Sequence, residues 1–137
     1  MRVSDIMTRE VRTIQPEQSI REAAQLMEQM DTGALLVAEN DRLVGMITDR
    51  DITIRAVAND CQNSTPIRDI MTKEIKYCFE DQDVNEIAEN MAENQVRRMP
   101  VVSREKRLVG VVSLGNIASS DESGAIRTMV EGVSARH

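Results

Sequence analysis

The chain has 137 residues, of which 41% are hydrophobic and 29% charged, and its formal net charge is −6, which suits one globular domain or two small fused ones. The lone His is the final residue, His137, and chain ends are rarely ordered, so we expect neither catalysis built on histidine nor a metal site. With only two aromatic rings and an excess of acidic residues, the chain is not expected to bind nucleic acid. It has no apolar run of the ~20 residues that a membrane span needs, so we expect a cytoplasmic protein with no membrane partner.

Two tetrapeptides recur along the chain. Asp5–Thr8 returns as Asp69–Thr72 at an offset of 64, and Arg42–Gly45 returns as Arg107–Gly110 at an offset of 65. The same order at nearly the same spacing indicates an internal duplication with one residue inserted in a turn. We therefore divide the chain into repeats at 1–63 and 64–137, joined near a polar stretch that ends in Pro66.

The first repeat predicts a strand, a helix, two strands and a helix. Ser19 and Glu22 form a capping-box signal that opens the first helix. The apolar residues that follow at helical spacing, and are predicted to form its core face, are Ile20, Ala23, Ala24, Met27 and Met30. Residues 34–38 and 43–48 are predicted strands around a polar turn, and a second helix is expected from about 50 to 58.

The second repeat follows the same order, which predicts an α/β (α+β) fold with one core built from two units. Asp83 and Glu86 open its helix, residues 99–102 and 108–113 are its predicted strands, and a short helix follows near 116–119. A terminal helix is expected to carry Ile126, Met129, Val130 and Val133. Cys61 and Cys78 lack CxxC spacing, so we expect reduced, structural thiols.

The segments Gly45–Asp51 and Gly110–Asn116, each with its upstream Asp-Ile-Met-Thr box, resemble the signature of the cystathionine-β-synthase (CBS) domain family. Over about 3–119 the chain is similar to a stand-alone CBS pair, or Bateman module. The resemblance implies two βαββα repeats with pseudo-twofold symmetry, and two clefts between them that take adenine nucleotides or related adenosyl ligands. AMP, ADP, ATP, NAD and S-adenosylmethionine all remain open as regulatory ligands, and no cofactor is required.

The first of these clefts has every group that the resemblance implies. Asp51, at a helix start, offers two acceptor oxygens for ribose hydroxyls, and Thr48 with nearby backbone N–H groups suits a phosphate. The resemblance places Arg97 and Arg98 at the phosphates, although they could instead form an ion pair with Glu93. The remaining residues of this cleft are Arg50, Thr72, Met99 and Pro100, with Ile75, Tyr77 and Val96 near the adenine.

The second cleft departs from the pattern and is expected to stay empty or to bind weakly. Asn116 replaces the ribose carboxylate, and an amide has one acceptor oxygen and no charge. The partner segment has no arginine, and Asp31 adds a negative charge there. The residues assigned to this cleft are Thr8, Val11, Gly33, Ala34, Leu35, Ser113 and Asn116.

Two functions remain open from the sequence. The first is a regulatory or sensor protein that binds an adenosyl ligand, forms a homodimer and signals to an unknown downstream protein. The second is a degenerate pair that acts as a structural or protein-interaction (stress-related) module without nucleotide. Thr and Asp before a helix are also ordinary capping residues, so the hypothesis of a module without nucleotide remains open.

Overall fold

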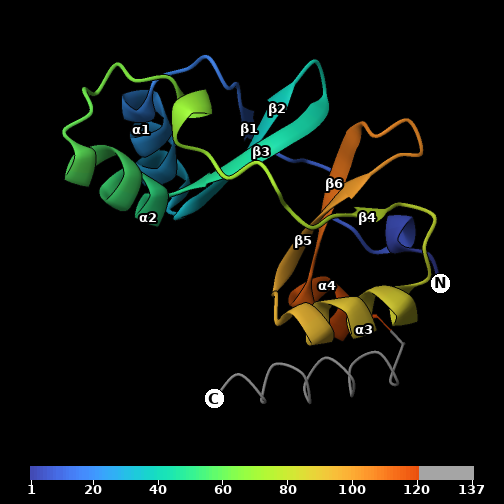
Figure 1. Cartoon of the computed structure of the whole chain (residues 1–137). Helices are drawn as coiled ribbons and strands as arrows, with labels where there is room; N and C mark the ends of the chain where they lie inside the picture. Colours follow the sequence, from blue (N-terminus) through green and yellow to red (C-terminus); the bar gives the residue numbers. More distant parts are fainter. Residues whose placement is uncertain (121–137) are drawn as a thin grey trace. The chain divides into compact units, whose positions relative to one another are not determined.

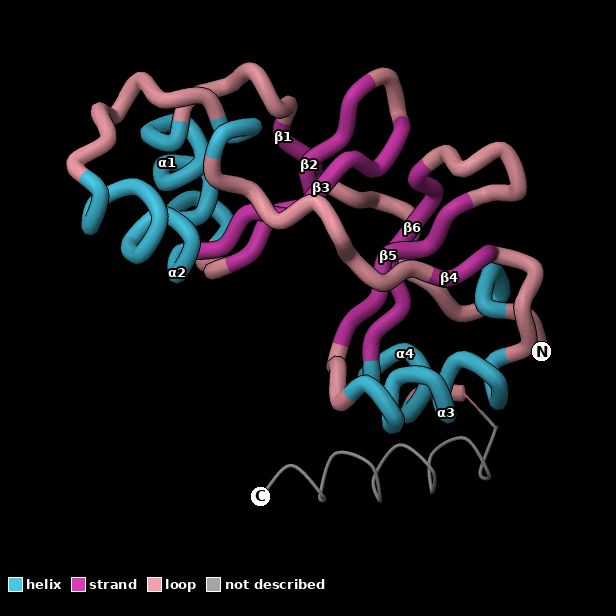
Figure 2. The backbone as a smooth tube through the Cα atoms, in the orientation of Figure 1, coloured by secondary structure: helices cyan, strands magenta, loops and turns pink. Residues whose placement is uncertain are grey.

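A computed structural model of the chain describes residues 1–120 and divides them into two compact units. The first-repeat unit comprises Arg12–Ile75, and the second-repeat unit comprises Met1–Val11 together with the chain from Lys76 onward (Figures 1 and 2). The expected terminal helix lies outside the described residues.

The first-repeat unit is a three-stranded sheet with helices. Its elements are β1 (Thr13–Ile14), α1 (Ile20–Met30), β2 (Ala34–Glu39), β3 (Arg42–Thr48) and α2 (Asp49–Asp51), and α2 continues as a π-helix over Ile52–Ala56 and a 3₁₀ turn over Val57–Asn59. The sheet order is β1-β2-β3, with β1 parallel and β3 antiparallel to β2. A short 3₁₀ turn at Ile67–Asp69 completes the unit.

The second-repeat unit has the same order of elements. They are a 3₁₀ turn at Val3–Asp5, β4 (Cys78–Phe79), α3 (Val84–Asn94), β5 (Arg98–Val102), β6 (Leu108–Ser113) and α4 (Leu114–Ala118). The sheet order is β4-β5-β6, again with one parallel and one antiparallel pairing. The α/β class and the strand-helix-strand-strand-helix order predicted for both repeats are confirmed.

The predicted helix starts are present, but they are capped in slightly different ways. Ser19 Oγ accepts a hydrogen bond from the Glu22 backbone N–H at 3.1 Å, which is one half of a capping box, while the Glu22 carboxylate accepts from Gln18 at 2.6 Å. Asp83 caps α3 by accepting from the Asn85 N–H at 3.0 Å. Glu86 does not return the bond to the cap, because its carboxylate accepts from Gln82 instead, at 2.9 Å.

Each unit is completed by a segment from the other repeat. Thr8, in the first Asp-Ile-Met-Thr box, pairs with Val111 of β6 through two backbone hydrogen bonds of 2.9 Å. Thr72, in the second box, pairs with Met46 of β3 through bonds of 2.8 and 2.9 Å. The two boxes therefore extend sheets built mainly by the opposite repeat.

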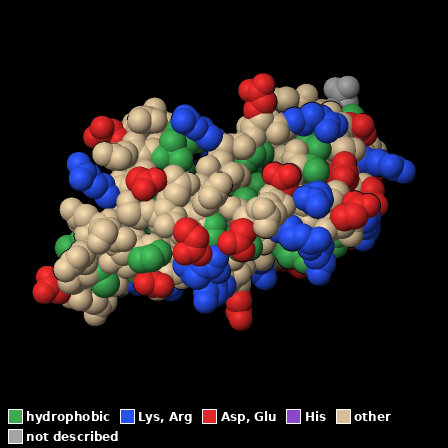
Figure 3. All heavy atoms as spheres, turned by 90° about the horizontal axis from the view of Figure 1, so that it is seen from above, with side chains coloured by type: hydrophobic (Ala, Val, Ile, Leu, Met, Phe, Trp, Pro, Cys, Tyr) green, Lys and Arg blue, Asp and Glu red, His purple; other side chains and the backbone are tan. Residues whose placement is uncertain are grey.

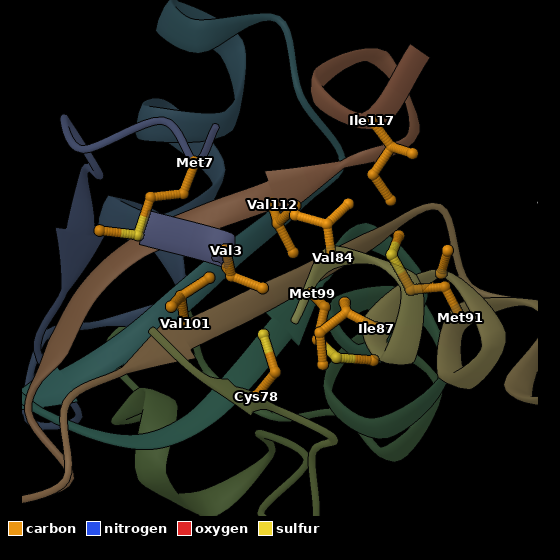
Figure 4. Close-up of a cluster of buried hydrophobic side chains, with 11 residues drawn as sticks. Val3, Met7, Cys78, Val84, Ile87, Met91, Met99, Val101, Val112 and Ile117 are labelled. Carbon is orange, nitrogen blue, oxygen red and sulfur yellow. The ribbon is translucent and has the colours of Figure 1, made fainter. Parts of the chain in front are cut away.

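The described residues form two hydrophobic cores, one in each unit, instead of the single core predicted from the sequence, and methionines and branched aliphatic residues fill both. In the second-repeat unit, side chains from the N-terminal segment, the sheet and both helices converge (Figure 4), namely Val3, Met7, Cys78, Val84, Ile87, Ala88, Met91, Met99, Val101, Val112 and Ile117. The first-repeat core consists of Ile14, Ile20, Ala23, Met27, Leu35, Val37, Ile47, Ala56, Ile67, Ile70 and Met71. Ala24 and Met30 lie exposed on α1, so the buried face of this helix is narrower than predicted.

Both cysteines are free thiols, and Cys78 is only 2% exposed within the core. Burial raises the pKa of the Cys78 thiol to about 12 from an ordinary value of 9.0. The folded protein therefore retains a proton that the unfolded chain releases above pH 9.0. Below pH 9.0 this thiol should not affect the free energy of unfolding. Between pH 9.0 and about pH 12 its burial should make the free energy of unfolding fall as the pH rises.

We expect the free energy of unfolding, measured with urea, to fall by about 2 kcal/mol more for the parent than for Cys78→Ala between about pH 8 and pH 10.5. The variant controls for all other groups that titrate in this range. Parallel slopes for the two proteins would contradict the buried thiol. A thiol reagent at neutral pH should likewise react with half-buried Cys61 and spare Cys78 until the chain unfolds.

The surface carries charges of both signs. On the face drawn in Figure 3, Lys and Arg side chains are scattered among Asp and Glu. Within residues 1–120, no helix combines the length and apolarity needed to cross a membrane.

Candidate functional site

Thr48 and Asp51 close the start of the helix that follows β3. Thr48 Oγ1 accepts from the Asp51 N–H at 3.1 Å, and Asp51 Oδ2 accepts from the Thr48 N–H at 3.0 Å. Asp51 is only 9% exposed, which is unusual for a carboxylate. The reciprocal bonds fix both side chains in place, so one oxygen of Asp51 is committed to the cap and one remains.

The remaining oxygen, Asp51 Oδ1, accepts no hydrogen bond within residues 1–120 and lies 3.7 Å from Arg55 Nε. Arg55 stands in the π-helical turn, and its Nη1 donates to the carbonyls of Ile70 and Met71 at 3.2 and 3.4 Å. Arg55 thus joins Asp51 to the segment contributed by the other repeat. Sequence reasoning missed this residue, although its i,i+4 spacing from Asp51 is a recognisable ion-pair signal.

Ser113 and Asn116 form the equivalent cap before α4. The Ser113 N–H donates to Asn116 Oδ1 at 2.8 Å, and the Asn116 N–H donates to Ser113 Oγ at 3.2 Å. The amide group therefore reproduces the cap, but its other atom, Nδ2, is a donor and donates to Thr8 Oγ1 at 3.5 Å. At the 65-residue offset the counterpart of Arg55 is Ser120, so this motif has neither the free carboxylate oxygen nor the adjacent cation.

Thr72 lies beside Thr48 in the first-repeat unit, and so do Gly33 and Ala34, two residues predicted to belong to the second cleft. Thr72 pairs with Met46, two residues before Thr48. Ala34 pairs with Thr48 across the sheet, and the Gly33 carbonyl accepts from the Asp49 N–H at 2.9 Å. Leu35, in contrast, is 3% exposed, so its side chain belongs to the core.

Three acidic residues lie near Gly33. It borders a hollow of about 510 Å³ that is lined in part by Glu28, Asp31 and Asp49. Like charge disfavours a phosphate there. Residues 1–120 contain no group of three or more His, Cys, Asp or Glu side chains arranged to hold a metal ion.

Arg97 and Arg98 lie at the start of β5, beside Ser113 in the second-repeat unit. Arg98 pairs with Ser113, and the Arg97 carbonyl accepts from the Leu114 N–H at 3.0 Å. Both arginines are exposed, and within the described part of the chain neither forms an ion pair, with Glu93 or with any other acid. Their charges are thus available to an anionic ligand.

The residues expected near the base differ in exposure. Tyr77 is 40% exposed, whereas Met99 is 2% exposed and contributes its side chain to the core. Ile75, Val96 and Pro100 are half-buried. Arg50 is exposed, and its backbone N–H donates to Asp49 Oδ1 at 2.8 Å. Val11 is half-buried.

Comparison with known proteins gives one consistent result. The family model for the CBS domain matches residues 3–57 and 67–122. The CBS domain-containing protein YhcV of Bacillus subtilis (strain 168) is 38% identical over 132 residues, which cover 93% of this chain and 94% of that protein. Hypoxic response protein 1 of Mycobacterium tuberculosis is 37% identical over 131 residues, which cover 94% of this chain and 91% of that protein.

Solved structures agree with this result. Hypoxic Response Protein I, determined with two coordinated zinc ions, matches with a TM-score of 0.75 and 37% identity, covering 86% of this chain and 97% of that one. The CBS domain pair of protein MJ0100, determined in complex with 5′-methylthioadenosine and S-adenosyl-L-methionine, matches with a TM-score of 0.68 and 32% identity, covering 86% and 93%.

Proposed function

We propose that this chain, which belongs to the CBS domain family, is a regulatory module that binds an adenosyl ligand and catalyses no reaction. The observation that carries the proposal is the Oδ1 atom of the nearly buried Asp51, which the helix cap holds in place. Within residues 1–120 this atom accepts no hydrogen bond, and its nearest cation is Arg55 Nε at 3.7 Å. A carboxylate oxygen without a hydrogen-bond donor is suited to accept from ribose hydroxyls. The MJ0100 pair, at 32% identity, supports the adenosyl class of ligand.

The two arginines narrow the ligand class. Arg97 and Arg98 are exposed and have no acid partner among the described residues, so a phosphate-bearing member such as AMP, ADP, ATP or NAD is favoured over an uncharged nucleoside. Guanidinium groups hold phosphate oxygens through paired, charge-assisted hydrogen bonds. We assign the ribose to Asp51, the phosphate to Arg97 and Arg98, and the base to the exposed ring of Tyr77 with Ile75 and Val96.

We expect Arg97→Gln and Arg98→Gln each to weaken the binding of AMP by about tenfold, because a hydrogen bond to a charged group contributes roughly 1.5–3 kcal/mol. The same variants should bind 5′-methylthioadenosine, which has no phosphate, as tightly as the parent. Isothermal titration calorimetry measures both affinities. Arg21→Gln, which removes an exposed arginine from α1, is the matched control and should change neither.

Two results would contradict the proposal. If the parent protein gives no binding signal with AMP, ADP, ATP, NAD, S-adenosylmethionine or 5′-methylthioadenosine, the chain is not an adenosyl sensor. If the arginine variants weaken the binding of 5′-methylthioadenosine as much as the binding of AMP, the assignment of the phosphate to Arg97 and Arg98 is wrong.

One observation favours the second candidate function, a structural or protein-interaction module. The Ser113–Asn116 motif makes the same helix cap as Thr48–Asp51 with an amide in place of the carboxylate, so capping alone explains why these residue types stand there. The calorimetric titration separates the two candidates. The homodimer and the downstream protein that reads the ligand are parts of the first proposal.

A further inference from the structure

Four side chains of the second-repeat unit form a continuous row. Tyr77 lies directly before β4, Phe79 is the last residue of β4, and Asp81 lies in the turn that follows. The Tyr77 ring meets the Phe79 ring edge-on, with 5.8 Å between centroids and 79° between planes. Arg104, from the turn between β5 and β6, lies 4.2 Å above the centre of the Phe79 ring.

Asp81 holds Arg104 in this position. Arg104 donates to the Asp81 carboxylate from Nε at 2.9 Å and from Nη2 at 2.7 Å. Two parallel bonds fix the plane of a guanidinium group as well as its distance. The hydrogen bond also lowers the pKa of Asp81 and raises that of Arg104, so both stay charged. The guanidinium therefore covers one face of Phe79, and Phe79 in turn supports the ring of Tyr77.

The row exists in only one unit. At the 64-residue offset the counterparts of Tyr77, Phe79, Asp81 and Arg104 are Thr13, Gln15, Glu17 and Asn40. The first-repeat unit has an arginine on the matching acid, because Arg68 reaches Glu17 at 2.6 Å, but it has no ring between them. The arrangement in the second-repeat unit is thus specific to the half of the molecule that carries Tyr77.

We propose that Arg104 is a positioning residue, which fixes Tyr77 through Phe79 as the surface against which the base of the ligand packs. The inference rests on the proposed function, which assigns the base to Tyr77. A ring held by its neighbour loses less conformational entropy when a planar ligand stacks on it, so binding is stronger than to a freely rotating side chain. Arg104 itself touches no part of the ligand.

Tyr77 allows a direct test, because the chain contains no other Tyr and no Trp. Its fluorescence, quenched by acrylamide in the ligand-free protein, reports the mobility and exposure of this one ring. We expect Arg104→Gln to increase the quenching and to weaken 5′-methylthioadenosine binding by about fivefold, since an exposed cation–π contact and a bidentate ion pair are both lost. Using a ligand without phosphate removes any direct attraction between Arg104 and a ligand charge.

Arg68→Gln is the matched control. It breaks the corresponding ion pair in the unit without rings, and it should change neither quenching nor affinity. Arg104→Lys keeps the charge but loses the planar fork, so it should resemble Arg104→Gln. Thermal unfolding confirms that each variant is folded.

The outcomes separate the two proposals. Unchanged quenching in both Arg104 variants, or increased quenching with unchanged affinity, would overturn the positioning role while leaving the proposed function intact. A parent protein that binds neither 5′-methylthioadenosine nor AMP would overturn the proposed function, and the role of Tyr77 with it.

Discussion

Asp51→Asn is expected to weaken the binding of both AMP and 5′-methylthioadenosine by about 10- to 100-fold, while the free energy of unfolding changes by less than about 0.5 kcal/mol. Affinity falls because the substitution removes the charge and leaves an amide donor where a ribose hydroxyl needs an acceptor. Stability is retained because Asn116 already makes the same cap in the second-repeat unit. Calorimetry and urea unfolding measure the two quantities.

Two alanine variants separate the cap from the ligand. Asp51→Ala should lose both affinity and about 1 kcal/mol of stability, whereas Asn116→Ala should lose a similar stability and keep the affinity. If Asp51→Asn binds AMP as tightly as the parent, the ribose assignment is wrong and the structural role of both motifs gains support. The comparison is sharp because the molecule contains an acidic and an amide version of one cap.

Much of the fold could be predicted because its signals are local or repeated. The alternating runs that became β3 and β6, and the capping residues Ser19 and Asp83, depend on neighbours a few positions away. The exposure of Met30 could not be predicted, since helical spacing does not reveal where the core ends. The π-helical turn after Asp51 could not be predicted either, because no residue type in 52–56 distinguishes it from an ordinary α-helix.

The candidate site was predictable in its residue types but not in its bonds. The motif around Asp51 identified a carboxylate at a helix start, yet only the folded structure reveals that one oxygen accepts the hydrogen bond of the cap and the other does not. The contacts of Arg104, and those of Arg55 with the segment from the other repeat, could not be predicted for one physical reason. Their partners, the carbonyls of Ile70 and Met71 and the ring of Phe79, come from segments at least 15 residues away in the chain.

Gly45→Ala is expected to destabilise the protein by about 2–4 kcal/mol, measured by urea unfolding. A Cβ at position 45 would lie 2.8 Å from Met71 Sδ and 2.8 Å from the Thr72 carbonyl oxygen. The methionine could move aside, but the carbonyl accepts the Met46 N–H at 2.9 Å and is fixed by that bond. Relief of the clash therefore requires the pairing between β3 and the segment from the other repeat to break.

Gly110→Ala and Gly115→Ala complete the test. A Cβ at position 110 would lie 2.8 Å from both Met7 Sδ and the Thr8 carbonyl oxygen, so this substitution should cost as much as that of Gly45. Gly115, in α4, has nothing closer than Ser113 Oγ at 3.5 Å, and alanine there should be neutral or stabilising by up to about 1 kcal/mol. Equal effects at all three positions would indicate a general intolerance of alanine. The expected difference instead explains the repeated tetrapeptides: the glycine of Arg-Leu-Val-Gly in each repeat is the place where the Asp-Ile-Met-Thr box of the other repeat packs.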